Sequence, residues 1–171
     1  MRAAFVIFVL ALATTARAEL IDRIMAVVGG QPITLSDVSA TLQFRLVQPP
    51  AGTRDPLLFA LDRAIERSLM LVEVDRFQPP EPDPVMMTIR IDELERAAGS
   101  AEAFEKVLAV TGTTREQLRR YIRDELRITT YLNQRFGANT PPQERTAAIA
   151  SWLAELRRRA EITMQYQPAV R

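Results

Sequence analysis

Two residue types are missing from this sequence altogether: cysteine and histidine. Without cysteine the chain can form no disulfide, and it has neither a catalytic thiol nor a thiolate metal ligand. Without histidine it lacks the commonest general base and the commonest zinc ligand, and every histidine-dependent triad is excluded. These absences close most routes to an enzyme or a metalloprotein, and we expect no metal and no cofactor.

The length and charge describe one globular domain with an ordinary surface. The chain has 171 residues, of which 47% are hydrophobic and 25% are charged, as in a typical folded domain. Its 22 basic and 21 acidic residues nearly cancel. Such a balance gives no support for binding a phosphate backbone, so we expect no nucleic-acid partner.

The first 18 residues have the pattern of a cleaved export signal. Met1-Arg2 supplies a positive start, residues 3–13 an apolar core, and Ala16-Arg17-Ala18 a cleavage site of small residues. That core is short for a bilayer span, and no later segment is long and apolar enough to be one. We predict cleavage before Glu19 and a soluble mature domain, whose formal charge changes from +1 to −1 because two arginines and no acids are lost.

Residues 21–38 predict a β-hairpin followed by the start of a helix. Alternate positions of residues 24–28 share a face, and both faces are apolar, which indicates a strand covered from two sides. Gly29-Gly30 can adopt the positive φ angles of a tight hairpin turn. Pro32 cannot donate a ladder hydrogen bond, so the return strand should be short and lie at an edge. Thr34, three residues before Asp37, then caps a helix.

Apolar stripes, capping residues and breaks predict six helices. The long second helix carries an apolar stripe through Leu61, Ile65, Leu69 and Val72, and its other apolar residues make it central to a bundle. The predicted ranges are 35–47, 56–77, 85–98, 101–110, from Thr113-Thr114 to 136, and a last helix after Pro142 with a stripe at Ile149, Trp152, Leu153, Leu156 and Ala160.

The chain ends with a second strand signal. Ile162, Met164 and Tyr166 alternate with polar residues, and such a strand has only the N-terminal hairpin to pair with. The fold class is therefore mostly α: a helical bundle with a small antiparallel sheet formed by an N-terminal hairpin and a C-terminal strand. It forms a single domain over residues 19–171, with an N-terminal region at 19–136 and a C-terminal helix and strand at 141–171.

The order of these motifs resembles the N-terminal region of the SurA-type periplasmic chaperones, the family linked to parvulin isomerase domains. The resemblance lies in the hairpin with its Ser36-Asp37-Val38 helix entry, in residues 57–77, in Gly112-Thr113 followed by Gln117-Leu118-Arg119, and in the helix end at residues 131–136. It implies a periplasmic location, and a groove among the helices that holds extended segments of unfolded outer-membrane proteins. It also implies that the last strand returns to the first ones.

The isomerase activity of that family is not carried over to this chain. Residues 137–142 leave no room for an inserted parvulin domain, and parvulin sites are built around histidines. Asp92, Glu93 and Glu95 are interpreted as solvated charge on a helix face, not as an acid–base pair. The three arginines at 157–159 complement a helix C-terminus, although they also suit an anionic partner. We predict that the chain is not an enzyme.

The function favoured by the sequence is ATP-independent holding of unfolded or extended polypeptide clients, including outer-membrane proteins, on an apolar surface. Methionine suits such a surface because it repacks around many sequences. The candidate client-binding residues, each with a competing role in the core, are Phe44, Val47, Met86, Met87, Ile89, Tyr121 and Tyr131. The alternative is an adaptor dedicated to one partner in envelope assembly. The oligomeric state is left open.

Overall fold

The computed structural model describes residues 22–168, so the predicted leader at residues 1–18 lies outside the described residues. The described chain begins with the predicted hairpin. Strand β1 (Ile24–Val28) pairs antiparallel with β2 (Gln31–Thr34). Gly29 and Gly30 join them with φ angles of 54° and 81°, which the absence of a side chain makes accessible.

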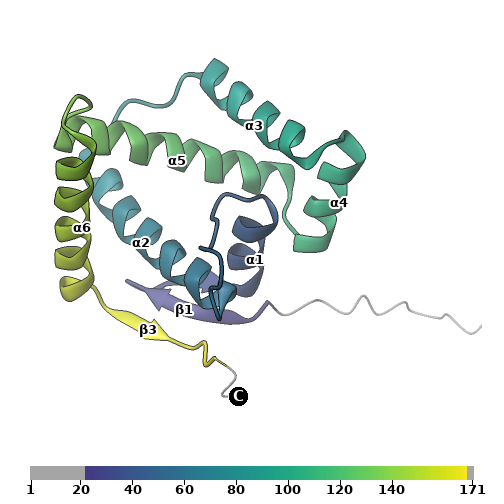
Figure 1. Ribbon diagram of the computed structural model, residues 1–171, viewed down its shortest axis with the longest axis horizontal. Coiled ribbons are helices and arrows are strands. Elements are labelled where there is room, and N and C mark those ends of the chain that lie inside the picture. Colours follow the sequence, from purple (N-terminus) through teal and green to yellow (C-terminus); the bar gives the residue numbers. More distant parts are fainter. Residues whose placement is uncertain (1–21, 169–171) are drawn as a thin grey trace, which may run out of the picture.

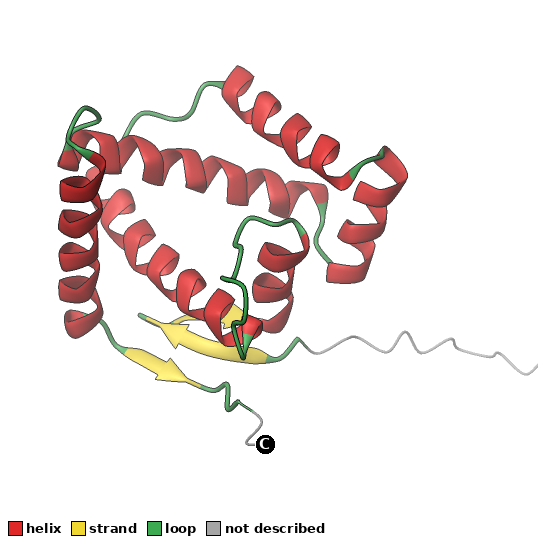
Figure 2. Ribbon diagram, in the orientation of Figure 1, coloured by secondary structure: helices red, strands yellow, loops and turns green. Residues whose placement is uncertain are grey.

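The C-terminal strand completes the sheet, as the sequence predicted. Strand β3 (Ile162–Met164) pairs antiparallel with β1, with Val27 opposite Thr163, and the strand order is β2-β1-β3. Figure 2 shows these three strands together on one side of the helices. The hydroxyl of Tyr166 donates to Asp55 Oδ2 over 2.9 Å, which ties the segment after β3 to the start of a helix. The two ends of the described chain therefore lie side by side.

Strand β1 is covered along most of its length, as its two apolar faces predict, but its first residue is exposed. Met25, Ala26 and Val28 are buried, whereas Ile24 is 45% exposed. The register between β1 and β2 shifts between Ile24 and Ala26. Such a bulge reverses the side-chain alternation, so neighbouring residues turn toward the same core and the first residue of the strand turns out.

Helix α1 (Leu35–Gln43) is shorter than the predicted range of residues 35–47. Its start follows the prediction, because Thr34 and Asp37 form a capping box in which each side chain bonds the other's backbone N–H. Its end does not. Arg45 adopts a φ of 54°, and the N–H of Leu46 turns back to the carbonyl of Thr41 over 2.8 Å. The left-handed residue ends the helix and redirects residues 45–50.

The other five helices lie within one or two residues of their predicted bounds. They are α2 (Pro56–Phe77), α3 (Pro84–Ala98), α4 (Ala101–Thr111), α5 (Arg115–Phe136) and α6 (Pro142–Arg159). Asp55, Ser100 and Thr114 cap α2, α4 and α5 with side-chain oxygens, as expected for these residue types. Within residues 22–168, no helix is both long enough and apolar enough to cross a membrane.

Two hydrophobic cores organise these elements. The sheet core packs the sheet against α2, α6 and the second half of α5; the helical core packs α3, α4 and the first half of α5 around Phe44. In Figure 1, α3 and α4 lie at the far end of α5 from α6. The buried residues of the sheet core are Met25, Ala26, Val28, Ile33, Val38, Ala60, Leu61, Ile65, Leu69, Val74, Ile128, Tyr131, Trp152 and Leu156. Those of the helical core are Phe44, Leu94, Phe104, Leu108, Leu118 and Ile122.

Helix α2 is central, but its predicted stripe is wrong at one end. Leu61, Ile65 and Leu69 are buried as predicted, whereas Val72 is 52% exposed and Val74 is buried instead. Near the end of α2, Phe77 packs against Tyr131 in the second half of α5 and Val74 joins the same core, so the buried face shifts around the helix. A pattern with a period of 3.6 residues assumes one buried face along the whole helix, so it could not predict that the last turn buries a different face.

Candidate functional site

A cavity of about 1020 Å³ opens where the two cores meet. Its lining comes from β2, α1, residues 44–48, α2, Gly112-Thr113 and α5. Exposed side chains, among them Asp37, Gln48 and Arg63, belong to this lining, so the cavity reaches the surface. Its volume is at the upper end of the range for ligand sites.

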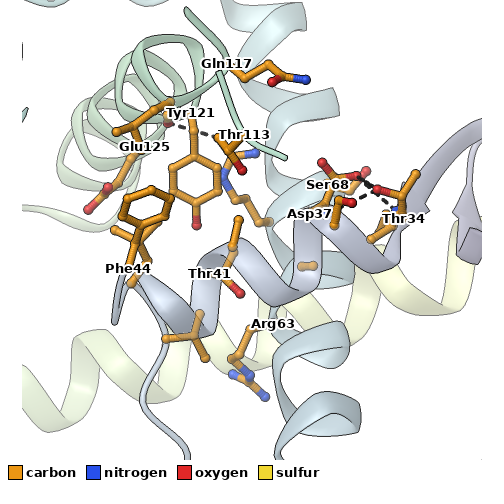
Figure 3. Close-up of a pocket in the computed structure, with 18 of the residues that line it drawn as sticks. Thr34, Asp37, Thr41, Phe44, Arg63, Ser68, Thr113, Gln117, Tyr121 and Glu125 are labelled. Carbon is orange, nitrogen blue, oxygen red and sulfur yellow. Dashed lines mark hydrogen bonds between the residues drawn. The ribbon is translucent and has the colours of Figure 1, made fainter. Parts of the chain in front are cut away.

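The cavity exists because small side chains occupy the places where large ones would close it. Ala40 and Thr41 on α1 and Ala64 and Ser68 on α2 are among its lining residues. The early end of α1 adds to the space, since residues 45–48 leave the helix and run along the cavity instead of filling it. Figure 3 shows Thr41 and Phe44 from the α1 side and Tyr121 from α5 around this space.

The walls of the cavity are apolar and partly aromatic. Phe44 and Tyr121 bring rings from the helical core, and Phe59 brings one from α2. Phe44 also contacts Phe104 with ring centroids 5.6 Å apart, which fixes the end of α1 to α4. The aliphatic and thioether side chains of the lining are Ile33, Leu46, Val47, Met70, Leu71, Leu118 and Ile128.

Arg67 anchors the Tyr121 wall. Its guanidinium lies 4.0 Å from the centroid of the Tyr121 ring, and Nη2 donates to the Tyr121 carbonyl over 3.1 Å. Nη2 also lies 3.6 Å from Asp124 Oδ2. Cation–π contacts are stronger when the guanidinium is shielded from water. This contact joins α2 to α5 beside the cavity. The Nε atom of Arg67 is buried without a hydrogen-bond partner in the described residues.

Burial changes the acid–base properties of two residues in the lining. Burial raises the pKa of the Tyr121 phenol, and the nearby Arg67 charge only partly opposes this, so the hydroxyl stays neutral across the physiological range. Burial also raises the pKa of Glu66, even though Arg63 Nη1 lies 2.6 Å from Glu66 Oε2. The lining of the cavity is therefore partly shielded from water, and this shielding disfavours the charged forms of both side chains.

The rim carries carboxylates that are already engaged with the protein. Asp37 accepts from the backbone N–H of Thr34 over 3.0 Å. Asp22 accepts from the N–H of Ser36 over 3.2 Å, and such hydrogen bonds lower the pKa of Asp22 although burial opposes them. Glu125 Oε1 accepts from Arg90 over 3.2 Å, while its Oε2 is buried without a partner in the described residues.

Three of the seven candidate client-binding residues come together at this cavity. Phe44, Val47 and Tyr121 all line it, from the C-cap of α1, the following loop and α5. Phe44 and Tyr121 also pack in the helical core, so their core and cavity roles coincide. The sequence carried no signal for Ile33, Phe59, Met70 and Leu71 as lining residues, because which side of α2 meets α1 is a matter of tertiary packing.

The other four candidates lie elsewhere. Met86 and Ile89 are 50% and 43% exposed on the first turns of α3, and Met87 beside them is half-buried; none of the three lines the cavity. Tyr131 is only 3% exposed, and its ring packs against Phe77 and Trp152 at centroid distances of 5.3 and 5.8 Å. Tyr131 is thus a core residue and is not available to a client.

Two of the three acidic residues of α3 are held in surface ion pairs. Glu93 pairs with Arg90 over 3.1 Å, and Glu95 pairs with Arg115 over 3.0 Å. In the part of the chain that the structure describes, no three acidic side chains gather into a group able to hold a metal ion.

No family model and no curated protein sequence matches this chain. The cavity and its surroundings are therefore interpreted from their own chemistry. Apolar and aromatic walls between two cores, with the polar groups of the rim already engaged, suit the capture of an apolar group.

Proposed function

We propose that this chain is a periplasmic, ATP-independent chaperone-like module that holds unfolded or extended segments of other polypeptides, including outer-membrane proteins, and that it has no isomerase activity. The cavity between the two cores would take an apolar or aromatic side chain of the client. The SurA-type order of sequence motifs, and the return of β3 to β1 that this resemblance implies, support the same assignment.

The single observation that carries the proposal is the composition of the cavity wall. Aromatic rings, Met70 and branched aliphatic side chains surround about 1020 Å³ that opens to solvent. Met and aromatic groups adapt to many side-chain shapes, which favours breadth over selectivity. Binding would protect a client by mass action, because a bound segment is removed from aggregation in proportion to its affinity and to the chaperone concentration.

A filled cavity provides the test. Ser68→Phe places a ring in the cavity from α2, whereas Val72→Phe places the same ring one turn later, at a position that is 52% exposed and does not line the cavity. We expect the wild type and Val72→Phe to suppress aggregation of a urea-unfolded outer-membrane protein at stoichiometric amounts. Ser68→Phe should lose most of this suppression while it keeps the wild-type circular dichroism spectrum. Equal suppression by all three proteins would contradict the role of the cavity.

The adaptor alternative makes a different prediction for the same cavity. An adaptor would retain one partner in stoichiometric amounts from a periplasmic extract, whereas a chaperone would retain many unrelated proteins. Loss of the retained proteins in Ser68→Phe, but not in Val72→Phe, ties either pattern to the cavity. If only one protein is retained, the result supports the adaptor function and contradicts the chaperone function.

A further inference from the structure

The two edges of the sheet differ in what they offer another chain. The carbonyl of Glu161 accepts from the N–H of Gly29 over 2.9 Å, and the N–H of Gln165 donates to the carbonyl of Met25 over 2.9 Å. Antiparallel ladders alternate, so with Val27 opposite Thr163 every second residue of β3 bonds to β1. The backbone groups of Ile162 and Met164 therefore point away from β1, at an outer edge of the sheet.

The opposite edge, formed by β2, has no free donor. The two-residue turn makes Val28 and Gln31 a bonded pair, so Pro32 and Thr34 are the residues whose backbones face outward. Pro32 has no N–H. The N–H of Thr34 donates to Asp37 Oδ2 over 3.0 Å. An incoming strand would thus find no donor on β2.

The β3 edge lacks the usual protection against strand pairing. Exposed edges are normally guarded by charged side chains, by proline or by bulges. Residues 162–167 contain no charged residue and no proline, and Met164 is 48% exposed. Among residues 22–168, no backbone hydrogen bond is made to the outer groups of Ile162 and Met164, and both side chains at this edge are apolar.

The two faces of β3 differ in the polarity of their side chains. Met164 and Ile162 lie opposite Ala26 and Val28, which are buried beneath the helices, so all four side chains belong to the helix face of the sheet. Thr163 belongs to the other face and is exposed. A strand added beside β3 would extend an apolar face on one side and a polar face on the other.

We propose that the outer edge of β3 binds an extended client segment by strand addition and prefers segments with an apolar side chain at every second position. This inference rests on the proposed holding function and specifies its substrate class. Strands of outer-membrane barrels alternate in this way, apolar outside and polar inside. Backbone hydrogen bonds supply the sequence-tolerant part of the binding, and the apolar ledge of Ile162 and Met164 supplies the preference.

A client segment fits this edge better than a second copy of the chain does. Two β3 strands would pair only three residues on each side, far below the roughly 1,200–2,000 Å² that stable interfaces bury. Holding a client requires only weak, reversible binding, for which a short edge suffices.

Met164→Pro tests the inference at one backbone atom. The N–H of Met164 is not used by β1, so proline removes an edge donor without breaking the existing ladder, and Thr163 already has the extended conformation that a following proline requires. The probe is a fluorescein-labelled peptide of alternating valine and threonine, followed by fluorescence anisotropy. We expect Met164→Pro to bind it about tenfold more weakly than the wild type, as for loss of an edge hydrogen bond and a steric block. Met164→Leu, which keeps both the N–H and an apolar side chain on the ledge, should change affinity much less.

A second measurement leaves the protein unchanged. Only every second amide of an added strand faces β3. N-methylation of those amides should abolish binding, whereas N-methylation of the amides between them should leave binding intact. On binding, amide exchange at Ile162 and Met164 should slow. Equal binding by wild type and Met164→Pro, equal binding of the two methylated peptides, or no peptide binding by the wild type would each overturn the inference. So would a dimer in sedimentation that Met164→Pro dissociates, because the edge would then belong to a second copy.

The two proposals fail separately. If the wild type and Met164→Pro suppress aggregation equally and Ser68→Phe does not, the cavity proposal stands and the edge inference falls. If the wild type neither suppresses aggregation nor binds the peptide, both fall.

Discussion

The sheet core and the helical core are assembled in opposite ways. The sheet core takes buried residues from both ends of the described chain, from Met25 in β1 to Leu156 in α6. The helical core takes all its buried residues from the stretch between Leu94 and Ile122, with the exception of Phe44. One core is built by long-range closure and the other by neighbours in sequence. The cavity lies where the locally built unit meets the globally closed one.

The strongest test of this contrast is Phe104→Ala in the helical core. Phe104 is fully buried, and its removal should cost about 4 kcal/mol of unfolding free energy, as for other buried phenylalanines. If the helical core opens as its own unit, amides of α3 and α4 will exchange much faster while those of β1 stay protected. Hydrogen exchange followed by mass spectrometry measures both. Val110→Ala, on the exposed side of the same helix, is the control; uniform acceleration in both cores would break the contrast.

The matching change in the sheet core is Leu61→Ala. Leu61 is fully buried on α2, and we expect a loss of about 3 kcal/mol in urea unfolding. Because α2 touches the sheet, α1, α5 and α6, the loss should appear in amides of every element and not in one half. Retained protection in β1 would show that the sheet core is not the cooperative centre of the fold.

Helix caps sharpen the contrast on a smaller scale. Asp55 accepts from Leu58 N–H over 2.8 Å at the start of α2 and also from the Tyr166 hydroxyl, whereas Ser100 accepts only a local bond from Ala103 in α4. Asp55→Ala should cost about 2 kcal/mol and Ser100→Ala about 1. In a Tyr166→Phe background the two caps should cost the same. A difference that persists there would mean that the end-to-end bond contributes nothing.

The smallest effect concerns Glu66, which lies in the cavity between the cores. Burial raises its pKa in the folded protein, and Arg63 opposes this only in part. The folded state therefore holds this proton more tightly than the unfolded state, so its stability rises as pH falls through the raised pKa and levels off below the ordinary glutamate value. Glu66→Gln should flatten the urea midpoint across that window. An unchanged pH profile would show that Glu66 is solvated in the folded state.

Local chemistry made the helix starts predictable from sequence. Asp55 before Pro56, Ser100 before α4, and Thr114 with Gln117 each satisfy backbone donors within one turn, and the structure places each helix start there. The meeting of β3 with β1 was also predictable, because a lone strand requires an edge and the hairpin offers the only one in the predicted pattern.

Tertiary contacts decided what the sequence could not. The end of α1 at Gln43 depends on a left-handed Arg45, and nothing in residue type favours that conformation for arginine. The bulge beside Ile24 turns that side chain out of a strand that is otherwise apolar. Both departures come from how the segments pack against their neighbours.

The candidate site was predictable only in part, for the same reason. Of the aromatic residues that the sequence offers as candidates, Phe44 and Tyr121 line the cavity. Tyr131 has the same chemistry and lies one helix face away from that space, inside the sheet core. Which ring lines the cavity and which is buried in a core depends only on how α1, α2 and α5 pack together.

The Met25 carbonyl accepts both the Gln165 and the Tyr166 N–H, each over 2.9 Å. Nearly the whole described chain separates these partners. A polypeptide made from its N-terminus delivers β1 well before β3, so the central strand stays half-paired until β3 has been made. During folding, β1 therefore has an unpaired edge for a time. An unpaired strand is also the kind of client segment that we propose this protein binds.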